Sequence, residues 1–366
     1  MREKVTKIWH RAEMLFHTYE RKLMSASFVF GFLWDNLTLT RIDLWLDDLI
    51  MFVYLLVAIF GIAVSNVGIG KARESGLGRM SVWSPFIMQF AFGGLFSNFI
   101  VFYSRSSSIG ASWPFLLFLA VMFVGNEFFQ KRYQQFGFQM SILFISIFSF
   151  SIFYVPLITN RIGGGVFLLS GVISLLFISL ILSIFGKILP YRVRASRRVL
   201  ARTIPAIFIL INVMYFTNLI PPLPLSLKDM GVFHNVERRV DGTYAVMYED
   251  TKWYEFFKRF EIYHHNAGER VYVYSSVFAP TDLDTKILHH WQFYDARSGE
   301  WKTADKLQFP IYGGRDGGYR GYSFKSNIDE GFWRVDVITD RGQLLGRVKF
   351  EVVRGAATNV QIDTLK

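Results

Sequence analysis

The chain has 366 residues, of which 52% are hydrophobic and only 19% are charged. This composition is typical of a protein that exposes much of its surface to lipid, and the length accommodates a membrane domain together with one soluble domain. The chain contains no cysteine, which excludes disulfides, thiolate metal sites and cysteine nucleophiles.

The net charge of +11 is unevenly distributed along the chain. Residues 1–231 carry 21 Lys and Arg against 10 Asp and Glu, whereas residues 232–366 carry 19 of each. The surplus basic residues flank long apolar runs, which is the arrangement that orients a protein in a bilayer. We therefore expect a lipid bilayer, and no nucleic acid, as the partner of this charge.

Residues 1–23 show a helical hydrophobic period with Lys and Arg on the opposite face. The apolar positions are Val5, Ile8, Trp9, Ala12, Leu15, Phe16, Tyr19 and Leu23. The pattern predicts a cytoplasmic amphipathic helix on the inner leaflet, and a docking helix for a cytoplasmic partner is the alternative.

Residues 24–221 are predicted to form a transmembrane domain of seven helices. Each run approaches the roughly 20 helical residues that cross a bilayer core of about 30 Å. In the last run we expect Pro205 in the first helical turn, where its missing N–H costs nothing. The seven spans lie at about 24–40, 46–66, 82–103, 109–128, 138–158, 164–186 and 203–221.

The first of these spans is short, and the distribution of basic residues supports it. With seven spans, 17 Lys and Arg lie on one side and three, Arg41, Arg105 and Arg161, on the other. Without it, the basic segment 187–202 would face outward, against the rule that Lys and Arg stay in the cytoplasm. This predicts a cytoplasmic N-terminus and a periplasmic C-terminal domain.

Two ionisable residues within the spans, Asp35 and Glu127, are candidates for transport or catalysis. Glu127 precedes Lys131 by four residues, so a helical ion pair at the inner interface also accounts for it. Asp35 falls near the outer end of its span, where a carboxylate costs less than at the centre. A transporter or membrane-embedded enzyme is the alternative to a function in the outer domain.

The sequence after the last span changes to a strand-like period. Residues 222–232 are a proline-rich linker, residues 233–355 alternate apolar and polar β-formers, and residues 356–366 form a tail. We expect an all-β, immunoglobulin-like antiparallel sandwich of seven or eight strands, with one helix at 250–260. Residues 333–337 and 344–352 are predicted to form a hairpin, with Trp333, Val335 and Val337 on its buried face.

Several segments of this domain resemble the bacterial family known as domain of unknown function 2914. They are His289-His-Trp291, Tyr322-Ser-Phe-Lys-Ser, Gly331-Phe-Trp-Arg-Val-Asp-Val337 and Gly342 to Val352. The resemblance covers about residues 25–65 and 270–353. It implies a bacterial membrane protein and brings no established activity. The family commonly carries a basic residue between the His and the Trp, and His290 stands there in this chain.

Aromatic residues interleaved with basic residues in this domain could present rings and donors to a glycan or a partner. The candidate ligand-binding residues are His290, Trp291, Tyr319, Arg320, Tyr322 and Lys325. The predicted function is that of a multi-pass inner-membrane protein whose periplasmic β-sandwich binds or scaffolds an envelope component, whether glycan, lipid or protein.

We expect neither a catalytic site nor a metal or other cofactor. Ser275, His290 and Asp336 contain the residue types of a hydrolytic triad, but the Gly-x-Ser-x-Gly turn of a nucleophile is missing. Adjacent histidines such as His289 and His290 point to opposite faces of a strand, so each pair offers one metal ligand per face.

Overall fold

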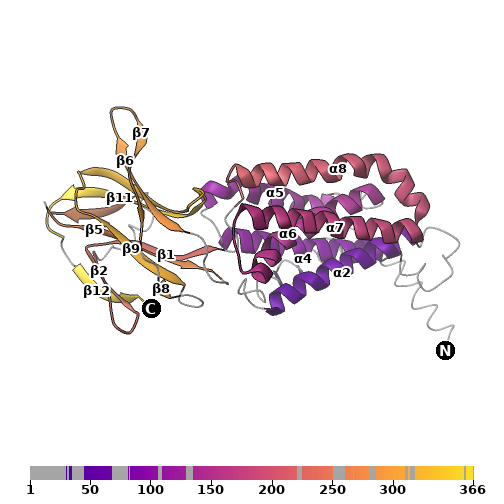
Figure 1. Ribbon diagram of the computed structural model, residues 1–366, viewed down its shortest axis with the longest axis horizontal. Helices are drawn as coiled ribbons and strands as arrows, with labels where there is room; N and C mark the ends of the chain where they lie inside the picture. The colour runs from indigo at the N-terminus through magenta and orange to yellow at the C-terminus, as the bar shows by residue number, and fades with distance from the viewer. Residues whose placement is uncertain are drawn as a thin grey trace. The chain divides into compact units, whose positions relative to one another are not determined.

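The computed structural model describes residues 30, 33–34, 45–67, 81, 83–105, 109–128, 135–220, 225–249, 260–266, 268–279, 286–309, 312–313, 318–357 and 360–365. They fall into two compact units. One is helical and ends at Thr217, and the other consists mainly of Asn218–Lys366 and is rich in strands (Figure 1).

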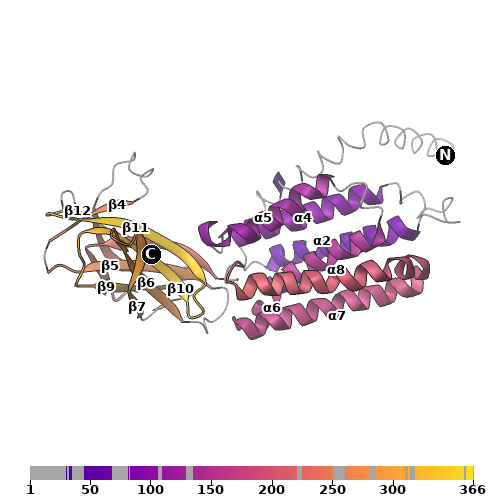
Figure 2. The same cartoon turned by 90° about the horizontal axis from the view of Figure 1, so that it is seen from above.

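The described part of the helical unit contains six helices that run side by side (Figures 1 and 2). By length and composition, five of them could cross a membrane, and α5 carries a shorter apolar stretch, Trp113–Gly125. A helical N-terminal region is therefore confirmed, while the expected span 24–40 and helix 1–23 lie almost entirely outside the described residues. The helices are α2 Trp45–Val67, α4 Ser84–Arg105, α5 Ile109–Phe128, α6 Phe136–Thr159, α7 Gly164–Ile188 and α8 Pro190–Phe216.

Helix α8 differs from the expected last span. It begins at Pro190, so the basic segment is helical and Pro205 lies inside the helix rather than in its first turn. Two local features explain this. Pro190 suits the first helical position, and the Arg, Ala and Leu residues that follow are strong helix formers. Thr203 also shares a hydrogen bond of 2.9 Å with Ser141 of α6, which helps to hold α8 against its neighbour.

Buried polar residues in the helical unit link helices to one another. The Asn66 side chain of α2 donates a 2.7 Å hydrogen bond to Oε1 of Gln139 in α6, and both residues are buried. The amide of Gln139 therefore has a structural role that accounts for its presence in an apolar helix.

The β unit contains twelve strands in its described part, more than the seven or eight expected. They form a four-stranded sheet in the order β1-β5-β9-β8, a five-stranded sheet β4-β11-β10-β6-β7, and a three-stranded sheet β12-β3-β2. The strands are β1 Ser226–Phe233, β2 Asn235–Arg238, β3 Tyr244–Glu249, β4 Glu261–His265, β5 Val271–Phe278, β6 Ile287–Asp295, β7 Glu300–Gln308, β8 Tyr312–Gly313, β9 Tyr319–Lys325, β10 Gly331–Thr339, β11 Leu344–Arg354 and β12 Val360–Leu365.

The segments expected to be a linker and a tail contribute strands. The end of the expected linker 222–232 forms most of β1, which pairs with β5, and the expected tail 356–366 forms β12, which pairs with β3. All strand pairs are antiparallel except β4 and β11, which run parallel. The expected helix at 250–260 lies outside the described residues apart from Phe260.

The two larger sheets share a hydrophobic core. Val273 of β5 packs in one cluster with Trp291 of β6, Trp333 and Val335 of β10 and Phe350 of β11, all of them buried. The predicted hairpin is confirmed as β10 and β11, in which Trp333 pairs with Phe350. This core fixes which side of the five-stranded sheet is covered and leaves the opposite side uncovered by the other large sheet.

Candidate functional site

We call the side of the five-stranded sheet that points away from the shared core the outer face. It carries three rows of side chains. Alternate residues of each strand point to the same side, and the strand register aligns them across the sheet. The first row is Lys306, His290, Asp336 and Arg347. The second is Thr303, Gln292, Arg334 and Lys349, and the third is Trp301, Tyr294, Phe332 and Glu351.

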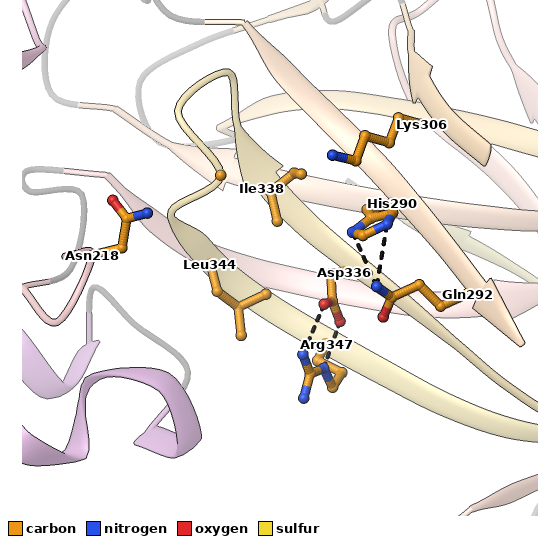
Figure 3. Close-up of a pocket in the computed structure, with 9 residues that line it drawn as sticks. Asn218, His290, Gln292, Lys306, Asp336, Ile338, Leu344 and Arg347 are labelled. Carbon is orange, nitrogen blue, oxygen red and sulfur yellow. Dashed lines mark hydrogen bonds and ion pairs between the residues drawn. The ribbon is translucent and has the colours of Figure 1, made fainter. Parts of the chain in front are cut away.

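A pocket of about 410 Å³ opens over the first row, and Gln292, Ile338 and Leu344 complete much of its lining (Figure 3). Within it, Asp336 accepts hydrogen bonds from Nε of Arg347 at 2.5 Å and from its terminal nitrogen at 2.7 Å. These bonds to the carboxylate raise the pKa of the Arg347 guanidinium. Asp336 is thereby buried in an ion pair, although its position on β10 points away from the core.

His290 lies beside this ion pair and is held by neutral partners. Its Nε2 lies 2.9 Å from the hydroxyl of Thr303. The amide nitrogen of Gln292 lies 3.3 Å from Nδ1 and 3.2 Å from Nε2 of the ring (Figure 3). Partial burial, reinforced by the charge of Lys306, lowers the pKa of His290 below its ordinary value. The imidazole is therefore neutral at pH 7, and the positive charge of the row comes from Lys306 and Arg347.

Arg334 is held in place by two neighbouring side chains of the outer face. Its Nε donates to Oε1 of Gln292, and its guanidinium carbon lies 4.5 Å from the centre of the Trp301 ring. Burial, together with repulsion from Arg347, lowers the pKa of Arg334. Among the described residues it forms no ion pair with a carboxylate, and the bonds that hold it come from neutral groups.

The third row places aromatic rings next to these cations. The rings of Tyr294 and Trp301 are 5.4 Å apart, and Phe332 contacts Phe260 at 4.7 Å. Tyr294 and Phe332 are each 37% exposed, which is high for rings that already pack against one another. Phe260 also stacks against Trp301 at 6.5 Å, so Tyr294 and Phe332 are the exposed rings that the outer face combines with its fixed cations.

Of the predicted ligand-binding residues, only His290 lies on the outer face. Trp291 points to the opposite side, is fully buried, and donates its indole N–H to the hydroxyl of Ser323 at 3.0 Å. The other four belong to β9 of the four-stranded sheet. The structure thus does not bring the six residues into one site.

The residues on β9 have separate surroundings. Tyr322 packs between Tyr244 and Tyr272, Arg320 lies over the ring of Tyr244, and Lys325 forms an ion pair with Asp305. Tyr319 packs against a hydrophobic cluster at the other end of β9.

The two intramembrane candidates are not placed by the structure. Asp35 lies outside the described residues, and Glu127 belongs to α5 with a side chain that is likewise not described.

Sequence reasoning missed Arg334, Trp301 and Lys349 as a group. A signal existed, because Arg334 lies on the polar side of the predicted hairpin and Lys349 lies opposite it on the partner strand. Trp301 lies on β7, and the register that carries its row across β6 to β10 depends on a bulge after Trp291, which strand alternation in the sequence does not reveal.

Ser275 bonds a histidine, as in a hydrolytic triad, but this histidine is not the His290 of the combination Ser275, His290 and Asp336. Ser275 bonds Nε2 of His289, not His290, at 2.8 Å, and Nδ1 of His289 lies 2.8 Å from Ser323. Burial lowers the pKa of His289 to about 3, so this imidazole is neutral and cut off from solvent. The geometry supports a buried structural network of Ser275, His289 and Ser323.

Glu249 is the centre of a second polar cluster. It accepts hydrogen bonds from His234 at 2.9 Å, from the His264 ring at 2.6 Å and from the His264 backbone at 2.8 Å. Burial opposes ionisation, but these bonds keep the pKa of Glu249 below its ordinary value. Within the described ranges, no group of three His, Cys, Asp or Glu residues is arranged to hold a metal ion.

A family model and a solved structure show similarity to this chain. A solved structure with similarity is "Pseudomonas fluorescens alkylpurine DNA glycosylase AlkC bound to DNA containing an abasic site analog", at 10% identity over 83% of this chain and 99% of that chain. Its TM-score of 0.22 is too low to support any argument about fold or function. No match was found among curated proteins. The family model described as Protein of unknown function (DUF2914) matches residues 284–352, so the region of the chain that carries the three rows of the outer face is similar to that family.

Proposed function

We propose that this chain is a multi-pass bacterial inner-membrane protein whose periplasmic, immunoglobulin-like β-sandwich binds or scaffolds an envelope component through its outer face. The membrane assignment is supported by five helices with the length and composition of spans. The orientation is supported by the 17 to 3 distribution of basic residues, which favours seven spans and a cytoplasmic N-terminus.

One observation carries the binding proposal. The outer face holds exposed rings and fixed cations on regular strands, whereas the opposite side of the same sheet packs into the hydrophobic core. Aromatic residues and arginine are the types that dominate binding surfaces. The region matched by the family model, residues 284–352, carries this face, and we take this as support for a role of the face in the proposed function.

Site-specific photocrosslinking in living cells tests the binding surface. A photoreactive residue replaces Thr303, which is exposed on the edge strand β7 in the second row of the outer face. A matched control replaces Phe324, which is exposed on β9 of the other large sheet. We expect a discrete adduct from position 303 and none from position 324. Equal adducts at both positions, or none at either, would remove the outer face as the binding surface.

The orientation has a separate test. Alkaline phosphatase, which is active only when exported, is fused after Leu227. Seven spans place this fusion in the periplasm and predict an active enzyme, because an odd number of crossings separates it from a cytoplasmic N-terminus. An inactive fusion with normal membrane insertion would contradict the seven-span topology.

A further inference from the structure

We infer that the ligand of the outer face is an acidic polysaccharide, with Arg334 binding its acidic groups and the aromatic row stacking against its sugar rings. This inference rests on the proposed function of the same surface. The positive charge of the outer face, the fixed position of Arg334 and the distance between the rows favour this ligand class.

The charge of the outer face selects for anions. Four cations, Lys306, Arg334, Arg347 and Lys349, share the three rows with two carboxylates, those of Asp336 and Glu351. The carboxylate of Asp336 is already occupied by Arg347. The face therefore carries a positive surplus, although residues 232–366 as a whole carry equal numbers of acidic and basic residues.

Arg334 has the features of an anion-binding group. Gln292 occupies its Nε and Trp301 supports the plane of the guanidinium, so the side chain is ordered before a ligand arrives. A guanidinium fork binds a carboxylate or a phosphate through two parallel hydrogen bonds. An anion here would also offset the repulsion between Arg334 and Arg347.

The spacing of the rows argues for a sugar polymer over simpler anions. Successive outward positions on one strand, such as Arg334 and Phe332, are about 7 Å apart. A ligand that uses both rows must offer an acidic group and a flat C–H-rich face at that separation. Acidic sugar units do so in every repeat, because the ring face stacks on aromatic side chains while the acidic substituent projects from its edge. A phosphate or lipid headgroup alone would leave the exposed rings of Tyr294 and Phe332 unused.

The test measures binding by the full chain in nanodiscs of neutral phosphatidylcholine. The probe is polygalacturonate, and its controls are the fully methyl-esterified polymer, which has the same rings without charge, polyphosphate, which has charge without rings, and polyglutamate, an acidic peptide. We expect polygalacturonate to bind at least about tenfold more tightly than any control. Its affinity should fall as salt rises, because the cations that carry binding are partly exposed.

Variants locate the binding on the named residues. We expect Arg334→Gln to weaken polygalacturonate binding about tenfold or more, and Trp301→Ala to weaken it severalfold. Arg270→Gln is the matched control, since Arg270 also stacks on an exposed ring, that of Phe324 at 4.6 Å, but on the other sheet. It should leave binding unchanged. Lys306→Gln alters an exposed side chain and should cause a severalfold loss even if Arg334→Gln disturbs folding.

Three results would overturn the inference. Equal binding of the esterified polymer would show that charge is irrelevant, equal binding of polyglutamate would indicate a peptide ligand, and equal losses in Arg334→Gln and Arg270→Gln would indicate unspecific attraction. Failure of the inference is distinguishable from failure of the proposed function. A crosslink at position 303 without polysaccharide binding would keep the surface and reject the ligand class, whereas absence of the crosslink would reject the surface itself.

Discussion

His289 makes the stability of the β unit strongly dependent on pH. His289 is fully buried between the hydroxyls of Ser275 and Ser323, and Phe309 covers its ring at 4.0 Å. None of these neighbours carries a charge, so burial alone lowers its pKa from 6.5 to about 3. On acidification His289 of the unfolded chain binds a proton near pH 6.5, whereas His289 of the folded chain stays neutral at that pH.

The size of the effect follows from this difference in proton uptake. Because the folded pKa lies below the unfolded one, unfolding is favoured as pH falls through 6.5, and the loss continues until the folded imidazole protonates near pH 3. Between pH 7 and pH 4.5 the free energy of unfolding should decrease by about 2.5 kcal/mol, at roughly 1.36 kcal/mol for each pH unit below 6.5.

Urea unfolding of the β unit in the full chain, reconstituted in nanodiscs and followed by near-ultraviolet circular dichroism, measures this loss at each pH. The reference is His289→Gln, whose amide can bond both serines without titrating. Glu249, whose lowered pKa also destabilises the fold in acid, is present in both proteins and cancels. We expect the wild type to lose about 2.5 kcal/mol more than the variant. Parallel pH profiles would refute a neutral buried His289.

Three further substitutions test the packing. Gly318 has φ +68, and an added Cβ would lie 2.8 Å from the side-chain oxygen of Ser276. Gly318→Ala should therefore lower the free energy of unfolding of the β unit by about 1–3 kcal/mol. An unchanged melting temperature would contradict this geometry. Asp336→Asn leaves Arg347 without its counter-charge, and because that arginine is partly exposed the loss should be about 1–2 kcal/mol by urea unfolding, falling at high salt. Asn66→Leu removes the hydrogen bond to Gln139 and should cost about 0.6 kcal/mol in bicelle unfolding, whereas a stabilised variant would show that the bond is not formed.

The helices could be predicted from the sequence because they depend on local properties. Five long apolar stretches correspond to helices, since composition and a 3.6-residue period are read within one segment. The start of α8 was placed too late because hydropathy marks where a helix meets lipid, while helix propensity continues through the arginines from Pro190 onward.

The strands could be predicted only in part because pairing is non-local. The β10–β11 hairpin was predicted, since its partners are adjacent in sequence and joined by a turn at Gly342 with φ +79. Strands β1 and β12 were missed because their partners lie far along the chain, in β5 and β3. A segment with weak strand character becomes a strand when a distant edge supplies its hydrogen bonds.

By itself, the sequence determined that the chain contains long apolar helices followed by a β-rich domain, and that His289 and His290 point to opposite sides of a strand. Only the tertiary structure decided which side is buried, because that depends on which face of the sheet the β5 core covers. The tertiary structure places Trp291 in the core. It also aligns Lys306, His290, Asp336 and Arg347 in one row, because strand register brings together residues that are far apart in the sequence.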